Sequence, residues 1–269
     1  MKKKKFNQID YIVENLASSF SKIENFELLQ ESEEGRKLFD FIVKSIADME
    51  SFQSLFLNYY IPASNKSIAD SWSQISSSKY KHLLNISKSD LKDNLYETIR
   101  LGYVGLFHKY ESYLKALVDA VNFLLKELNE ISDLLSIEKY CQREYGINIY
   151  KSHNHFAITC KVNYISNCIK HYDGLPVKEP IHERFAHFSK DEKIQIERDE
   201  FKSDIDRMKG HCELLLSQIL AIGFKQFIES EIHGENENAR VLKEKYDQIL
   251  KNFEYTLSDF SNPRNYFTQ

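Results

Sequence analysis

The 269-residue chain has few of the residues that interrupt regular structure: it contains 8 glycines and 4 prolines. Because glycine and proline most often end helices, their scarcity leaves room for long uninterrupted elements, which we expect to be helices. No glycine- or proline-rich linker divides the chain, and its length is enough for one sizeable core. We therefore expect a single domain over residues 1–269.

Cysteine is also scarce. The four cysteines, Cys141, Cys160, Cys168 and Cys212, include no Cys-x-x-Cys pair. This spacing favours reduced core residues of an intracellular protein over a disulfide framework or a zinc site.

Long apolar runs and a basic overall charge are missing as well. No window reaches the roughly 20 apolar residues of a membrane span, and the lysines at 2–5 are not followed by the apolar region of a signal peptide. The net charge of −4 gives no global basic field for nucleic acid. Glycine-rich phosphate loops and dinucleotide fingerprints are lacking, so we expect no cofactor. Because the chain has neither a membrane span nor a signal peptide, we expect a cytoplasmic protein with no membrane partner.

The chain does contain apolar residues that alternate spacings of four and three, the pattern of amphipathic helices. The fold class that this pattern predicts is an all-α, elongated helical bundle. We expect it to be built on two long antiparallel helices, at 90–135 and 190–231. Further helices are predicted at 6–24, 36–60 and 238–258.

Two segments interrupt this pattern in the first half of the chain. Pro62 is expected to end the helix at 36–60, and the serine- and lysine-rich stretch 63–89 reads as a connector with a short helix near its middle. Ser87 and Asp90 have the spacing of a capping box at the start of the next helix.

The second interruption is an insertion over 136–189. Residues 146–150 and 155–160 could be two short strands or an irregular excursion, and 158–172 reads as a short helix. The tail at 259–269 is expected to be loose.

Residues 163–176 of this insertion carry the strongest chemical suggestion. Asn167 and His171 lie one helical turn apart, with Lys170 beside the histidine and Asp173 just beyond it. An imidazole can act as a general acid or base, and an adjacent cation can hold a phosphate, which suits metal-free RNA cleavage. The alternative is structural: the same side chains could cap the end of the helix.

Two further pairs could contribute. Arg100 and His108 are eight residues apart, about 12 Å along a helix, so each could line a cleft shared with His171 or lie on the polar flank of the apolar seam. Arg207 and His211 share a helix face, for which we expect a solvated or interfacial role.

A metal site is not expected. His153 and His155 could ligate zinc together with another histidine, such as His171, His182 or His187. No cysteine or carboxylate stands at a clear companion spacing, and the chain has no His-Glu-x-x-His run.

The segment Ile165-Ser-Asn-Cys-Ile-Lys-His-Tyr-Asp-Gly-Leu-Pro resembles the signature of HEPN domains (higher eukaryotes and prokaryotes nucleotide-binding). His171 matches the motif histidine, and Asn167 matches the polar residue after the motif arginine. Ser166 stands where the arginine is expected. Lys161 and Lys170 are the nearby cations, and a lysine lacks the bidentate fork of a guanidinium.

The resemblance implies an all-α bundle and leaves two functions open. One is a metal-independent endoribonuclease of toxin–antitoxin or antiphage systems, acting as a homodimer on an RNA substrate. In it, His171 and Asn167 would act on the scissile group, and Lys170 and Arg100 would hold phosphate. The other is a catalytically inactive scaffold subunit that dimerises or docks a protein partner, such as an antitoxin or sensor.

Overall fold

The structure is a computed structural model that describes residues 33–121, 154–179, 185 and 187–232. Several sequence predictions lie outside these residues, namely the helices at 6–24 and 238–258, the short strand or irregular excursion at 146–150 and the tail at 259–269. No helix among the described residues is long and apolar enough to cross a membrane.

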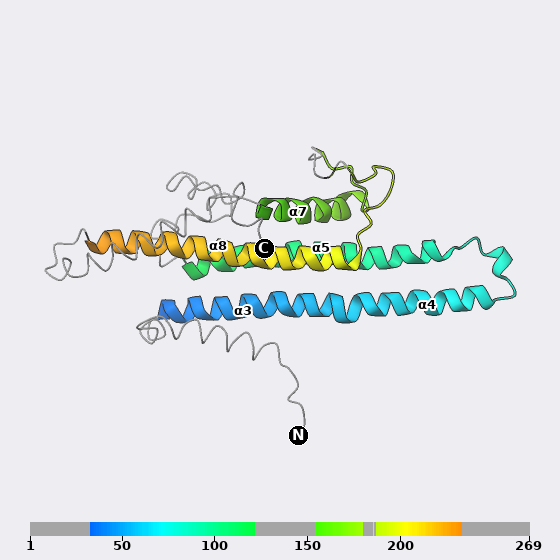
Figure 1. Cartoon of the computed structure of the whole chain (residues 1–269), viewed down its shortest axis with the longest axis horizontal. Coiled ribbons are helices and arrows are strands. Elements are labelled where there is room, and N and C mark those ends of the chain that lie inside the picture. Colours follow the sequence, from blue (N-terminus) through cyan, green and yellow to red (C-terminus); the bar gives the residue numbers. More distant parts are fainter. Residues whose placement is uncertain (1–32, 122–153, 180–184, 186, 233–269) are drawn as a thin grey trace, which may run out of the picture.

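The described residues form an all-α bundle, as predicted, and contain no strand. Its helices pack side by side along one long axis (Figure 1). In chain order the elements are α3 (Glu33–Leu55), the π-helical turn η1 (Phe56–Tyr60), α4 (Ile61–Ser77), the 3₁₀ turn η2 (Lys81–Leu83), α5 (Lys88–Val121), α7 (Asn154–Tyr172) and α8 (Arg198–Ile232).

Helices α3 and α4, joined by η1, form one continuous rod. The prediction for Pro62 is therefore wrong. Pro62 does not end a helix, because α3, η1 and α4 follow one another without a break. Proline cannot donate to the preceding turn and its ring crowds that turn. The chain meets this with the wide turn η1 just before Pro62, where the Ile61 N–H donates to the Phe56 carbonyl.

The stretch 63–89 was predicted to be a connector with a short helix near its middle. It is helix α4 up to Ser77, and residues 78–87 connect α4 to α5. Ile61 and Ile68 are buried, and Trp72 and Ile75 are partly buried. These positions fall on one face of a helix, so burial against α5 outweighs the modest helix propensity of the intervening serines.

Helix α5 begins with the predicted capping box. The Ser87 N–H donates to Asp90 Oδ2 at 2.7 Å, and the Asp90 N–H donates to Ser87 Oγ at 3.2 Å. From this cap α5 runs for 34 residues, and α4, α3, α7 and α8 all pack against it.

Helices α5 and α8 are parallel, so the antiparallel prediction is wrong. Three tyrosines of α5, spaced seven residues apart, are hydrogen-bonded to three polar residues that have the same seven-residue spacing. These partners lie at the start of α8 and along it. The pairs are Tyr96 with Glu197 (2.8 Å), Tyr103 with Asp204 (2.5 Å) and Tyr110 with His211 (2.9 Å). Both partners advance together along the chain, which requires the two helices to run the same way (Figure 1).

The apolar seams of these two helices are used inside the chain. On α5 the buried members are Tyr103, Tyr110, Leu114 and Leu117. On α8 they are Phe201, Ile205, Met208, Cys212 and Leu215. The described parts of the seams therefore build the core and are not available to a second chain.

Helix α7 covers the remaining side of α5 and begins at Asn154, four residues before the predicted start. Residues 155–160 are helical, so neither the short strand nor the irregular excursion considered for them is present. Ile158, Val162 and Ile165 are buried in the common core. Packing on α5 overrides the β-branched composition that suggested a strand.

Candidate functional site

The segment 163–176 forms the second half of α7 and the turn after it. The helix ends at Tyr172, as the sequence predicts. Asp173 and Gly174 then adopt left-handed backbone conformations, with φ of 53° and 81°, and the Gly174 N–H donates to the Cys168 carbonyl at 3.0 Å. A glycine accepts this conformation without strain, which explains its place in the turn.

The position of the motif arginine faces the interior. Ser166 is 0% exposed, and its hydroxyl has no hydrogen-bond partner among the described residues. An arginine there would have its guanidinium in the core between α7 and its neighbours. The serine is therefore matched to the packing of this bundle, and the position does not adjoin solvent beside His171.

Asn167 is half-buried and is bound to its own helix. Its Nδ2 donates to the carbonyl of Asn163 at 2.8 Å and to Asn163 Oδ1 at 2.5 Å. These bonds to the preceding turn agree with the structural alternative for Asn167.

Lys170 and His171 are exposed side by side in the last turn of α7. The Lys170 Nζ lies 5.6 Å from the centre of the Phe107 ring, a cation–π contact with α5. The His171 ring meets the edge of the neighbouring Tyr172 ring, with 6.4 Å between centres. Of the predicted catalytic residues, these two alone have exposed side chains.

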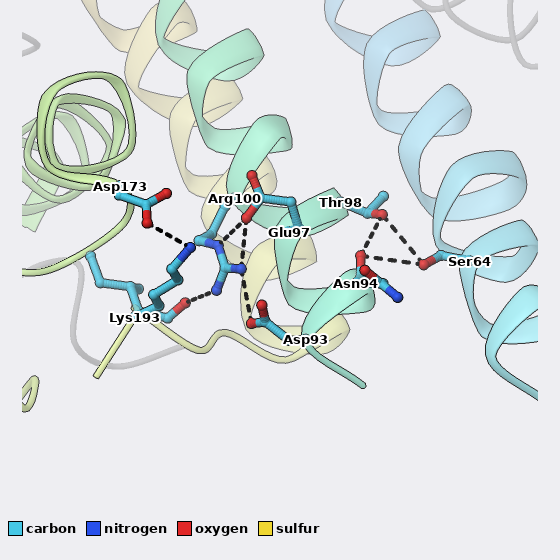
Figure 2. Close-up of polar contacts among 9 residues, drawn as sticks. Ser64, Asp93, Asn94, Glu97, Thr98, Arg100, Asp173 and Lys193 are labelled. Carbon is cyan, nitrogen blue, oxygen red and sulfur yellow. Dashed lines mark hydrogen bonds and ion pairs between the residues drawn. The ribbon is translucent and has the colours of Figure 1, made fainter. Parts of the chain in front are cut away.

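Arg100 lies beneath the turn but is closed off from solvent, at 1% exposed. Figure 2 shows its guanidinium enclosed by two carboxylates and a carbonyl. The Nη2 atom pairs with Asp93 at 2.9 Å and Glu97 at 2.7 Å, and Nη1 donates to the Ile194 carbonyl at 3.1 Å. The predicted phosphate ligand is thus a buried structural ion.

The same network holds the end of α7. The Ile194 N–H donates to the Gly174 carbonyl at 2.9 Å, and Lys193 pairs with Asp173 at 2.9 Å (Figure 2). A Cβ on Gly174 would lie 3.2 Å from the Arg100 Cδ, so the glycine also makes room for the arginine stem. The conspicuous Asp-Gly turn therefore docks α7 onto α5 and the segment before α8.

Lys161 also forms ion pairs away from the turn. It pairs with Glu200 at 2.7 Å and with the buried Asp204 at 2.5 Å. The Asp204 carboxylate accepts the Tyr103 hydroxyl as well. Lys161 lies ten residues before His171, about 15 Å along the helix, so these two predicted site residues are separated.

His108 and the pair on α8 do not complete a site. His108 is exposed on α5, two turns from the buried Arg100. Of the solvated or interfacial role predicted for the pair on α8, the solvated alternative is wrong for His211, which is 2% exposed and bonded to Tyr110, while Arg207 is exposed. His155 falls in α7, and no group of three potential metal ligands occurs among the described residues.

The three tyrosine pairs between α5 and the α8 region, described above, were not predicted from the sequence. Burial raises the pKa of the Tyr103 hydroxyl, and the Asp204 carboxylate beside it adds to this effect. Hydrogen bonds from Lys92 and Tyr96 lower the pKa of Glu197. The equal seven-residue spacing of the tyrosines and of their partners was the signal that could have found it.

Two hollows lie away from this segment. A cavity of about 70 Å³ opens between α3, α5 and α8, where burial raises the pKa of Glu213. This volume equals that of about two waters, too little for a nucleotide. An open groove of about 430 Å³ runs between α4 and α5. Its walls comprise Tyr60, Ala63, Ser64, Ser67, Ile68, Ser71, Leu91, Asn94 and Thr98.

Comparison of the chain with protein-family models, curated proteins and solved structures finds no match. The HEPN resemblance therefore rests on residues 163–176 and on the all-α architecture.

Proposed function

We propose that the protein is a catalytically inactive, HEPN-like helical binding subunit, which dimerises or docks a protein partner. One observation carries the proposal. Arg100, whose side-chain stem lies against Gly174 of the turn after α7, is buried and already satisfied by Asp93, Glu97 and the Ile194 carbonyl. A phosphate could reach it only after displacing both carboxylates.

The local charges add to this argument. Arg100 and Lys161 each face two carboxylates, so each cluster carries one positive charge against two negative charges. Stabilising the charge that develops on a phosphate requires preorganised donors and cations facing the substrate. Net negative clusters work against the approach of an RNA backbone.

The surface at η1 suits a binding role. The π-turn η1 places Tyr59 on the surface at 65% exposed and Tyr60 at 48% exposed. Tyrosine is enriched in protein interfaces, and π-turns often occur at functional positions in helices. We take the two exposed rings as the centre of the docking surface.

Light scattering of the purified protein during size exclusion tests this proposal. We expect a dimer, and we expect the double variant Tyr59→Ser/Tyr60→Ser to dissociate it or to lose a co-purifying partner. Tyr80→Ser/Tyr172→Ser removes two exposed rings elsewhere and serves as the matched control. A wild-type monomer with no partner, or equal behaviour of both variants, would contradict the proposal.

A metal-independent ribonuclease is the second candidate. The exposure of Lys170 and His171 on one turn favours it, because a second copy could bring another such pair opposite them. It predicts RNA cleavage in EDTA that His171→Ala abolishes. Intact RNA at every protein concentration would exclude it.

A further inference from the structure

The turn between α4 and α5 forms an exposed tip at one end of the bundle. Every residue from 79 to 90 is exposed, and Figure 1 shows the turn extending beyond the start of α8. Backbone hydrogen bonds fix its shape. The Lys81 N–H donates to the Ser78 carbonyl at 3.2 Å, and the Leu83 N–H donates to the Tyr80 carbonyl at 2.9 Å. An ordered turn therefore presents these side chains.

The tip differs in charge from the rest of the chain. Residues 71–89 hold Lys79, Lys81 and Lys88 and no acidic residue, although the chain as a whole has a net charge of −4. No ion pair joins these three lysines to any described residue. The Lys79 Nζ instead lies over the Tyr80 ring, 4.9 Å from its centre.

Large apolar side chains stand among these lysines. Leu83 is 69% exposed, Tyr80 55%, Leu84 42% and Ile86 41%. Single exposed apolar residues are ordinary, whereas a group of them rimmed by charge marks an interaction surface. We call residues 79–88 the tip surface.

We propose that the tip surface docks on an anionic lipid bilayer. Leucine and isoleucine enter the boundary between headgroups and acyl chains, while lysines stay with anionic headgroups. A bilayer can be bound by a protruding surface without a complementary pocket. A projecting turn of ten residues therefore suits it. The inference is independent of the proposed function. It departs from the expectation of no membrane partner, which was based on the lack of a spanning segment and of a signal peptide.

Other partners fit these side chains less well. A stable protein interface takes about 800 Å² and 20–30 residues from each partner, more than the tip surface offers. Single-stranded RNA uses lysines and stacked aromatic rings. It leaves Leu83, Leu84 and Ile86 without a role, and Lys79 already covers one face of Tyr80.

Co-sedimentation of the full chain with vesicles tests the proposal. At about 50 mM salt, we expect binding to vesicles of phosphatidylcholine with phosphatidylserine, and none to phosphatidylcholine alone. About 500 mM salt should weaken the binding strongly, because surface charges are screened. Lys79→Ser/Lys81→Ser should lower the partition coefficient about 25-fold, from about fivefold for each lysine. Leu83→Ser should lower it about tenfold.

Matched controls separate the tip from general effects. Lys44→Ser/Lys115→Ser removes two exposed lysines from the sides of the bundle, and Leu101→Ser removes another leucine that is 55% exposed. Both controls should bind as the wild type does. No binding to anionic vesicles would overturn the proposal, as would equal losses in tip and control variants. Binding of labelled single-stranded RNA through Lys79 and Lys81, without vesicle binding, would assign the surface to nucleic acid instead.

Discussion

Replacing Arg100 by methionine tests whether this residue is structural. The change keeps most of the side-chain stem and removes the guanidinium. The converse change, Asp93→Asn/Glu97→Gln, keeps the guanidinium and removes both of its opposite charges. The two variants disturb the same contacts from opposite sides, so their costs can be compared directly.

The magnitudes follow from where each charge sits. Arg100 is 1% exposed, whereas the side chains of Asp93 and Glu97 are 53% and 47% exposed. In Arg100→Met both carboxylates regain water, and the main loss is the donor to the Ile194 carbonyl, about 1–3 kcal/mol. In the double variant a buried guanidinium loses its counter-charges, which costs about 3–5 kcal/mol.

Urea unfolding followed by circular dichroism measures both costs. The double variant should be the less stable of the two. Arg198→Met, at an exposed arginine, should change the free energy of unfolding by less than about 0.5 kcal/mol. A greater loss in Arg100→Met than in the double variant would refute the reasoning, as would no loss in either.

Three more predictions concern the same packing. Gly174→Ala should cost about 1–2 kcal/mol in urea unfolding, since its φ of 81° strains any side chain; an unchanged midpoint would contradict this. Glu197 has a lowered pKa, so its contribution to stability is present above its ordinary value of 4.5 and is lost as pH falls through its folded pKa. Glu197→Gln should therefore flatten the fall in stability between about pH 5 and pH 3, by less than about 1 kcal/mol at this exposed position. Burial raises the pKa of the Cys168 and Cys212 thiols, so mass spectrometry should find them labelled by a thiol reagent only in urea; rapid labelling of either in the native protein would oppose this.

The sequence allowed the all-α class, the Ser87–Asp90 cap and the end of α7 to be predicted, because each depends on local spacing. It did not allow the direction of α8 relative to α5 to be predicted. An apolar seam indicates which side chains face inward, and it is compatible with a parallel or an antiparallel partner helix. The polar pairs, such as Tyr103 with Asp204, contain the directional information.

Other errors arose where tertiary packing overrode local preference. Helix α4 was read as a connector from its serines, although Ile61 and Ile68 mark a buried face. The β-branched start of α7 resembled a strand until its burial against α5 was known. For the candidate site, Lys170 and His171 are neighbours in the sequence and are both exposed, whereas the burial of Arg100 and Ser166 was not visible from composition.

RNA cleavage in EDTA tests the central proposal most directly, that the protein is a binding subunit that does not cleave RNA. Purified wild-type protein, His171→Ala and Arg100→Met would each be incubated with labelled structured and single-stranded RNA, over a wide range of protein concentrations. We expect intact RNA in all three. Wild-type cleavage that is lost in a stably folded His171→Ala variant would contradict it.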